Sequence, residues 1–166
     1  LMKWAGMENH MGEEQIIVKI GEEEKTYPAG ISFLSIAQEY QDRYEDDIVL
    51  ALYNNRLREL KKTIEKDGEL SFLTTSDKTG KRAYRRSVTL LMQKAVWNLW
   101  SKEHIGVHVR YAIGQGYYCE LMKDGESCKI TEAMIGSLKK EMYRLVMADL
   151  PIEKYSMNTD EAVALF

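Results

Sequence analysis

The sequence predicts an α+β protein made of two small domains. Three features predict it: short strand-like segments around one helix in the first 75 residues, a polar break at 76–82, and two long helical stripes beyond that break. A chain of 166 residues has the length of one ordinary domain or two small ones. Its 45% hydrophobic content and 2 prolines are typical of a folded chain.

The first domain is expected to span residues 14–75. Residues 15–20 are rich in β-branched side chains, and a polar turn separates them from a second strand that Pro28 and Gly30 end, which predicts a hairpin. Ser32 can cap a helix that continues to about Tyr44. Further strands are expected at 47–53, 56–60 and 69–74.

The second domain is expected to span residues 83–166, after a linker at 76–82, and to be incomplete. Its first helix is predicted by an apolar stripe at helical spacing, formed by Val88, Leu91, Met92, Ala95, Val96 and Leu99. Strands are expected at 107–112 and 117–121. Thr131 can cap a second long helix that ends near Asp149, because Pro151 disfavours helical geometry before it. A last helix is expected from Asn158 or Thr159.

Composition predicts in which part of the cell the protein is found. No run approaches the roughly 18 to 20 apolar residues of a membrane span, so no membrane contact is expected. Residues 1–13 are expected to be a flexible leader, and they lack the pattern of a secretory signal. Cys119 and Cys128 are the only cysteines, which favours reduced thiols and a cytoplasmic protein.

Charge is unevenly distributed along the chain. Residues 76–110 carry eight Lys or Arg against two Asp or Glu, whereas the whole chain has a formal net charge of −3. A basic segment in an acidic chain is typical of nucleic-acid or phosphate surfaces. A solvent-exposed linker can have the same excess of Lys and Arg without binding anything.

The first domain resembles a TGS domain, the small ubiquitin-like β-grasp module of threonyl-tRNA synthetases and (p)ppGpp synthetases. The resemblance lies in IIVKIGEEEKTYPAGISFLSIAQEY, DIVLALYNNRLREL and GELSFLTTS. From Arg85 the chain resembles the second, editing domain of threonyl-tRNA synthetases, through RRSVTLLMQKAVWNLW, IGQGYYCEL and ITEAMIGSLKKEMYRLVMADLPIEKYSMNTDEAVALF. The resemblance covers nearly the whole chain after Glu14.

One departure bears on activity. Editing domains carry a His-x-x-x-His pair at the start of their first helix, and the matching residues here are Arg86 and Leu90. Neither can act as a neutral imidazole base, so editing chemistry is expected to be lost. The same pair of domains precedes a uridine-kinase-like domain in bacterial nucleoside kinases, and the chain resembles that family more.

The resemblance implies a non-catalytic N-terminal recognition or regulatory module of a nucleoside (uridine) kinase-like protein, with RNA or a nucleotide as ligand. A C-terminal kinase domain outside this chain is the implied partner, since no GxxxxGK[ST] loop occurs here. A homo-oligomer is a further expectation. Two alternatives stay open: a trans-acting editing hydrolase of mischarged tRNA, and a ligand-free oligomerisation module.

The ligand-binding candidates are chosen from the basic segment and from the resemblance to editing domains. In the resembled editing domains the 3′ end of tRNA enters near the first-helix start, where positive charge is otherwise disfavoured by the helix dipole. Tyr84, Tyr111, Tyr117 and Tyr118 can provide stacking faces for bases or serve as ordinary strand residues. The candidate set is Lys78, Lys81, Arg82, Arg85, Arg86 and Tyr117.

No catalytic residue, metal site or cofactor is expected within the chain. His104 and His108 have helical metal-ligand spacing, but Gly106 and β-branched neighbours favour loop or strand there, so two isolated surface histidines are predicted. Cys119 has no base placed beside it by the sequence, which favours a buried strand cysteine.

Overall fold

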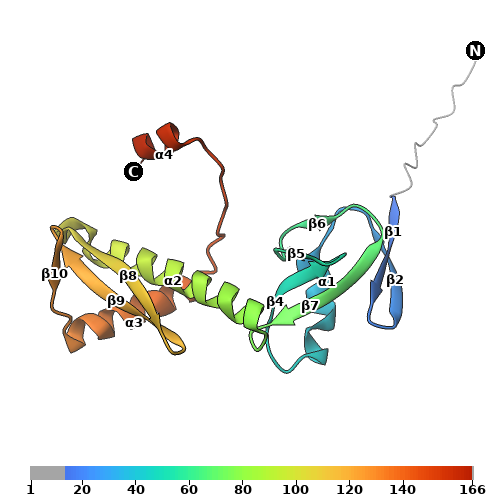
Figure 1. Ribbon diagram of the computed structural model, residues 1–166, viewed down its shortest axis with the longest axis horizontal. Coiled ribbons are helices and arrows are strands. Elements are labelled where there is room, and N and C mark those ends of the chain that lie inside the picture. The colour runs from blue at the N-terminus through green and yellow to red at the C-terminus, as the bar shows by residue number, and fades with distance from the viewer. Residues whose placement is uncertain (1–13, 166) are drawn as a thin grey trace, which may run out of the picture. The chain divides into compact units, whose positions relative to one another are not determined.

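The computed structural model describes residues 14–165, which form two compact units that divide between Ser87 and Val88. Each unit combines helices with β-sheet (Figure 1), so the predicted α+β class is confirmed. The expected leader at 1–13 lies outside the described residues. Within the described part of the chain, no helix is long and apolar enough to cross a membrane.

The first unit is built on a five-stranded sheet. In spatial order the strands are β2 (Glu23–Pro28), β1 (Gln15–Ile20), β7 (Gly68–Thr74), β4 (Ile48–Tyr53) and β5 (Arg56–Arg58). β1 and β7 are parallel, and the other pairs are antiparallel. The remaining elements are β3 (Ile31–Ser32), α1 (Phe33–Tyr40), the short helix η1 (Gln41–Arg43) and β6 (Thr63–Ile64).

One face of this sheet and α1 enclose the core. Along β1, buried and exposed residues alternate, as expected for a strand with one covered face. The Ser32 hydroxyl caps α1 by accepting a hydrogen bond from the Ser35 amide at 3.1 Å, as predicted. The most deeply buried large side chains are Val18, Phe33, Ile36, Ile64 and Leu70, and burying each such side chain contributes about 1.5 to 3 kcal/mol. A mixed sheet crossed by a single helix is the β-grasp arrangement that the resemblance implies.

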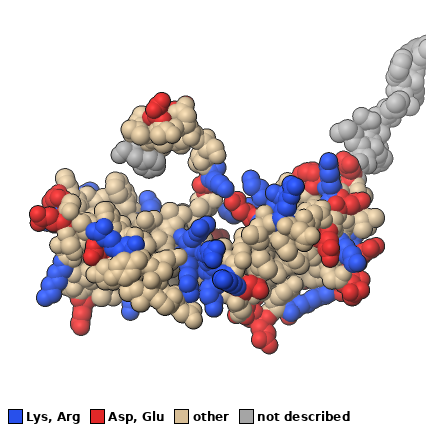
Figure 2. Space-filling view, viewed as in Figure 1, with Lys and Arg blue, Asp and Glu red and all other residues tan. Residues whose placement is uncertain are grey.

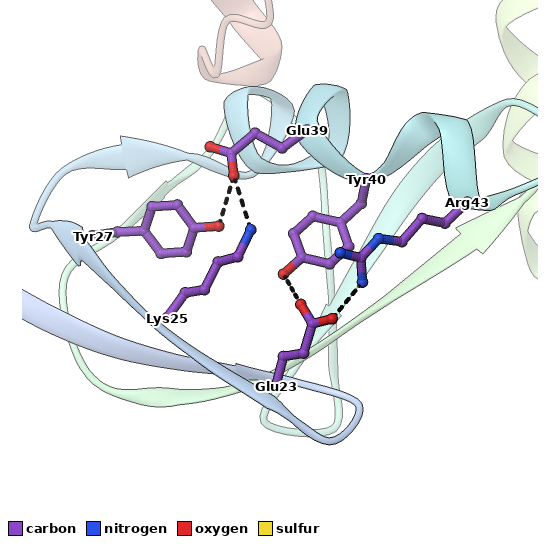
Figure 3. A network of polar contacts seen from close by, with 6 residues as sticks. All are labelled: Glu23, Lys25, Tyr27, Glu39, Tyr40 and Arg43. Carbon is purple, nitrogen blue, oxygen red and sulfur yellow. Dashed lines mark hydrogen bonds and ion pairs between the residues drawn. The ribbon is translucent and has the colours of Figure 1, made fainter.

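A polar network ties the first hairpin to α1 and η1 (Figure 3). Its members are Glu23, Lys25, Tyr27, Glu39, Tyr40 and Arg43. Glu23 accepts from the Arg43 guanidinium at 2.8 Å and the Tyr40 hydroxyl at 3.1 Å, which lowers the pKa of Glu23. Lys25 and Arg43 lie over the Tyr40 ring, 4.7 and 4.5 Å from its centroid. Because these charges pair with one another, the network stabilises the packing of the hairpin.

The second unit contains a three-stranded antiparallel sheet and two long helices. α2 (Lys78–Trp100) begins in the first unit, and the short helix η2 (Ser101–Glu103) follows it. The sheet has the order β10 (Glu126–Cys128), β9 (Gly116–Lys123), β8 (Ile105–Ile113). α3 (Glu132–Met147) starts at the predicted cap Thr131, whose hydroxyl accepts from the Met134 amide, and α4 is Thr159–Leu165. The small core of this unit contains Val96, Ile105 and Leu121.

The structure corrects the predicted linker. Residues 78–82 are the first helical turns of α2, so only Ser76 and Asp77 of the segment 76–82 lie outside regular structure. The helix was not apparent from the sequence because its first two turns have no apolar stripe. The residue that packs these turns against the sheet is Gly80, and a glycine adds no apolar side chain to a helical stripe.

Candidate nucleic-acid interface

The start of α2 is fixed to the end of β7 by Asp77. The Asp77 carboxylate accepts hydrogen bonds from the Thr74 amide at 2.7 Å and from the Thr74 hydroxyl at 3.2 Å. Its backbone carbonyl accepts from the Lys81 amide at 2.7 Å, the first bond of the helix. A short polar turn thus leads straight from strand to helix.

Gly80 determines which side of α2 faces the sheet. This residue is buried, and a Cβ atom built on it would lie 1.9 Å from the Thr74 carbonyl oxygen and 3.0 Å from a Val49 methyl group. Only glycine permits so close an approach between the helix and the strand ends. The first turns of α2 therefore pack on the sheet through Gly80.

The five predicted cations lie on the side of α2 opposite Gly80. Lys78, Lys81, Arg82, Arg85 and Arg86 follow the spacing i, i+3, i+4, i+7, i+8, which places them on one helix face. Gly80 is two residues from both Lys78 and Arg82, or about 200° around the helix. We call these five residues the basic face of α2, and Figure 2 shows Lys and Arg side chains gathered along this part of the helix.

The basic face is exposed and largely unneutralised. Arg85 is half-buried, whereas the other four side chains are exposed. Within residues 14–165, Lys78, Lys81, Arg82 and Arg86 make no ion pair, and the first turn of α2 contains no acidic residue. Because a helix start is already electropositive, concentrating cations there is unfavourable unless an anion binds.

The sixth candidate, Tyr117, is not on this helix. It lies on β9 in the second unit and is 40% exposed. Alternation along β9 puts Tyr117 on the same side of the sheet as Cys119 and Leu121, which face the helices. Tyr118, its neighbour, is on the other side and stacks against Tyr111.

The second unit also contains an apolar cavity of about 110 Å³ between its sheet and its two long helices. Its lining includes Met92, Val96, Cys119, Leu121, Met134 and Leu138. Burial raises the pKa of the Cys119 thiol, which disfavours the reactive thiolate. No histidine is among the described residues that line this cavity.

The two histidines with metal-ligand spacing lie before and within β8. His104 precedes β8 in a left-handed conformation, with its Nδ1 atom 3.2 Å from the Asp124 carboxylate, and His108 lies within β8. In the part of the chain that the structure describes, no group of three potential metal ligands is assembled.

No family model matches the chain. It is similar to threonine–tRNA ligases: 27% identical to that of Syntrophomonas wolfei and 30% to that of Thermotoga maritima, each over 143 residues. It is 31% identical to that of Carboxydothermus hydrogenoformans over 144 residues. These matches cover 86 to 87% of this chain and 22% of each relative, so the chain spans about a fifth of the length of the curated relatives it matches.

The resemblance to threonyl-tRNA synthetases is thereby confirmed. The link to nucleoside kinases stays a prediction.

Proposed function

We propose that this chain is a non-catalytic RNA-recognition module that binds the phosphate backbone of RNA through the basic face of α2. The basic face is the observation that carries the proposal: five cations on one helix side, four of them exposed and without an ion pair among the described residues. Similarity to threonine–tRNA ligases supports a tRNA as the RNA. We propose that its acceptor end lies at this helix, as the resemblance to editing domains implies.

The chemistry at this face is electrostatic. Lysine ammonium groups act as point charges toward phosphate oxygens, whereas arginine guanidinium groups can form two parallel hydrogen bonds. Between Lys78 and Arg86 the helix rises about 12 Å, so the cations follow an extended backbone rather than a single phosphate. An anionic strand bound there would also offset the unfavourable charge at the helix start.

The absence of catalysis is part of the proposal. Arg86 and Leu90 stand where the resembled editing domains have their two histidines, and neither side chain can accept a proton from water at neutral pH. The Cys119 thiol is disfavoured as a nucleophile by its raised pKa. As a finer proposal, the chain serves as the recognition part of a nucleoside kinase-like protein in the cytoplasm.

The test compares two variants that lose the same charge at different places. K78Q/K81Q/R82Q/R86Q neutralises the exposed part of the basic face, and K123Q/K129Q/K139Q/K140Q neutralises four exposed lysines elsewhere. Binding of a fluorescent tRNA acceptor-stem RNA is measured at low salt, with nucleoside triphosphates as competitors. We expect the first variant to bind at least about tenfold more weakly than the second, because it loses several phosphate contacts.

Three results would contradict the proposal. Equal weakening in both variants would mean that only net charge matters, and no binding by the wild type would leave the oligomerisation module as the better account. Accelerated deacylation of a mischarged tRNA by the wild type would instead favour the editing hydrolase.

A further inference from the structure

The sheet of the second unit has one face turned away from the helices, which we call the open sheet face. Val107, Cys119 and Leu121 belong to the opposite side and line the apolar cavity. Side chains alternate between the two sides along the paired strands β8 and β9. The residues that alternate with these three therefore lie on the open sheet face. Its members are His108, Arg110, Tyr111, Tyr118, Glu120 and Met122. Glu120 also borders the cavity, but its carboxylate bonds Arg110 on the open sheet face.

A β-bulge brings a cation and an aromatic ring together on this face. Regular alternation would place Arg110 and Tyr111 on opposite sides, but the register shifts between Val109 and Tyr111. Arg110 donates to the Glu120 carboxylate at 2.7 Å, while Tyr111 stacks against Tyr118. Since Tyr118 and Glu120 are two residues apart on β9, Arg110 and Tyr111 both lie on the open sheet face.

The two tyrosine rings form an exposed, nearly parallel stack. Their centroids are 5.1 Å apart, the planes meet at 22°, and Tyr111 and Tyr118 are 58% and 41% exposed. Beside them the Arg110 side chain, 43% exposed, is held by Glu120 and by the Met122 sulfur at 3.8 Å. Planar groups are thus fixed on a flat surface and left accessible to solvent.

We propose that the open sheet face is a stacking platform for unpaired bases of single-stranded RNA. The inference rests on the proposed RNA-binding function and adds a second contact to it. Aromatic rings and guanidinium planes stack on the faces of bases, and only bases that are not buried in a duplex expose those faces.

The charge of this face fits a neutral base better than a phosphate or an apolar partner. Glu120 offsets the charge of Arg110, so the face has little excess charge for a phosphate. An apolar protein surface would have to desolvate this ion pair and His108, at a cost that a base with polar edges avoids. Glu120 also raises the pKa of Tyr118, so the ring beside this ion pair stays uncharged.

The experiment uses a single-stranded RNA octamer containing one 2-aminopurine, whose fluorescence is quenched when it stacks on a ring. The variant Y111A/Y118A removes the platform, Y111F/Y118F keeps both rings, and Y143A removes an exposed tyrosine of α3 as a control. We expect quenching and affinity to be retained in Y111F/Y118F and Y143A. Y111A/Y118A should lose the quenching and bind about 5- to 100-fold more weakly, given the usual contribution of base–aromatic stacking.

The outcomes separate this inference from the proposed function. Unchanged quenching and affinity in Y111A/Y118A, with binding lost in K78Q/K81Q/R82Q/R86Q, overturns the platform and leaves the basic face standing. Quenching that persists in K78Q/K81Q/R82Q/R86Q and disappears in Y111A/Y118A supports the platform and counts against the basic face. A wild type that binds the acceptor-stem RNA but neither binds nor quenches the octamer overturns the platform alone, and one that binds neither RNA overturns both proposals.

Discussion

At the scale of single residues, Gly80 is the position on which the start of α2 depends. The helix can approach the sheet there because no Cβ intervenes between its backbone and the Thr74 carbonyl oxygen. The same contact leaves the basic face on the opposite, exposed side. A glycine in a helix normally costs about 0.5 to 1 kcal/mol relative to alanine, and here close packing offsets that cost.

Replacing Gly80 with alanine is therefore expected to destabilise the protein. The new methyl group would overlap backbone atoms, which cannot move aside as a flexible side chain can, so a loss of about 1 to 3 kcal/mol or more in the free energy of unfolding is expected. Gly136→Ala on α3 is the matched control, since nothing lies within 4 Å of its added Cβ, and it should be neutral or stabilising. Urea denaturation measures both, and equal effects would contradict the packing argument.

Cys119 gives a second prediction at this scale. Burial raises the pKa of its thiol, so a smaller fraction is thiolate at any given pH than for a free cysteine. In a Cys128→Ser background, alkylation by iodoacetamide should be slower than that of a cysteine-containing peptide at pH 7 to 8, with its rate profile moved to higher pH. A rate faster than that of the peptide would indicate an activated nucleophile and weaken the non-catalytic proposal.

At the scale of elements, α3 is joined to α2 by a polar clamp. Glu141 accepts from the Arg144 guanidinium at 2.7 and 2.8 Å and from the Asn98 side-chain amide, on α2, at 2.8 Å. These bonds, led by the one to Arg144, lower the pKa of Glu141 to about 2. The clamp is therefore charged across the whole physiological pH range.

The lowered pKa predicts a pH dependence of stability. A carboxylate with a depressed pKa in the folded state stabilises it fully above its unfolded pKa, near 4.5, and loses that contribution as pH falls toward 2. Wild type should exceed Glu141→Gln in stability at pH 6, and the gap should shrink between about pH 4.5 and 2. Thermal unfolding measures the gap, with Glu126→Gln as an exposed control, and a gap that is constant with pH would contradict the clamp.

Sequence patterns predicted those elements whose buried side chains repeat. The β-branched strand at 15–20, the caps Ser32 and Thr131, and the second long helix that follows Thr131 all lie where they were predicted. The start of α2 could not be found in this way, because its contact with the sheet is made by a glycine and its exposed side is polar. The short strands β3 and β6 were not predicted, since each has only two residues and pairs with a segment about 30 residues away. β10 was not predicted either, because it has only three residues, which pair with β9 across a short turn.

Sequence reasoning singled out the five cations of the basic face but not the open sheet face. Local charge density identified all five cations, and helical spacing then explains why they share a face. The open sheet face was not predicted, because a bulge changes which residues share a side of the sheet, and bulges leave no clear mark in a single sequence. Tyr117, chosen from the tyrosine cluster, lies on the other side of the sheet from Tyr118.

At the scale of the whole molecule, positive charge is concentrated in a chain that is otherwise acidic. Residues 76–110 contain eight of its 23 Lys and Arg, while the formal net charge of the chain is −3. General attraction to RNA is therefore weak for the chain as a whole, and affinity should depend on one local surface. This concentration separates a dedicated binding face from the diffuse attraction of a basic protein.

The salt dependence of RNA binding shows whether the phosphate contacts lie on the basic face of α2. The logarithm of the binding constant falls linearly with the logarithm of salt concentration, with a slope of roughly 0.7 to 0.9 per phosphate contacted. For the acceptor-stem RNA, we predict that the slope of the wild type loses about three units in K78Q/K81Q/R82Q/R86Q and is unchanged in K123Q/K129Q/K139Q/K140Q. Equal slopes for all three proteins would contradict the account, because they would place the phosphate contacts away from α2.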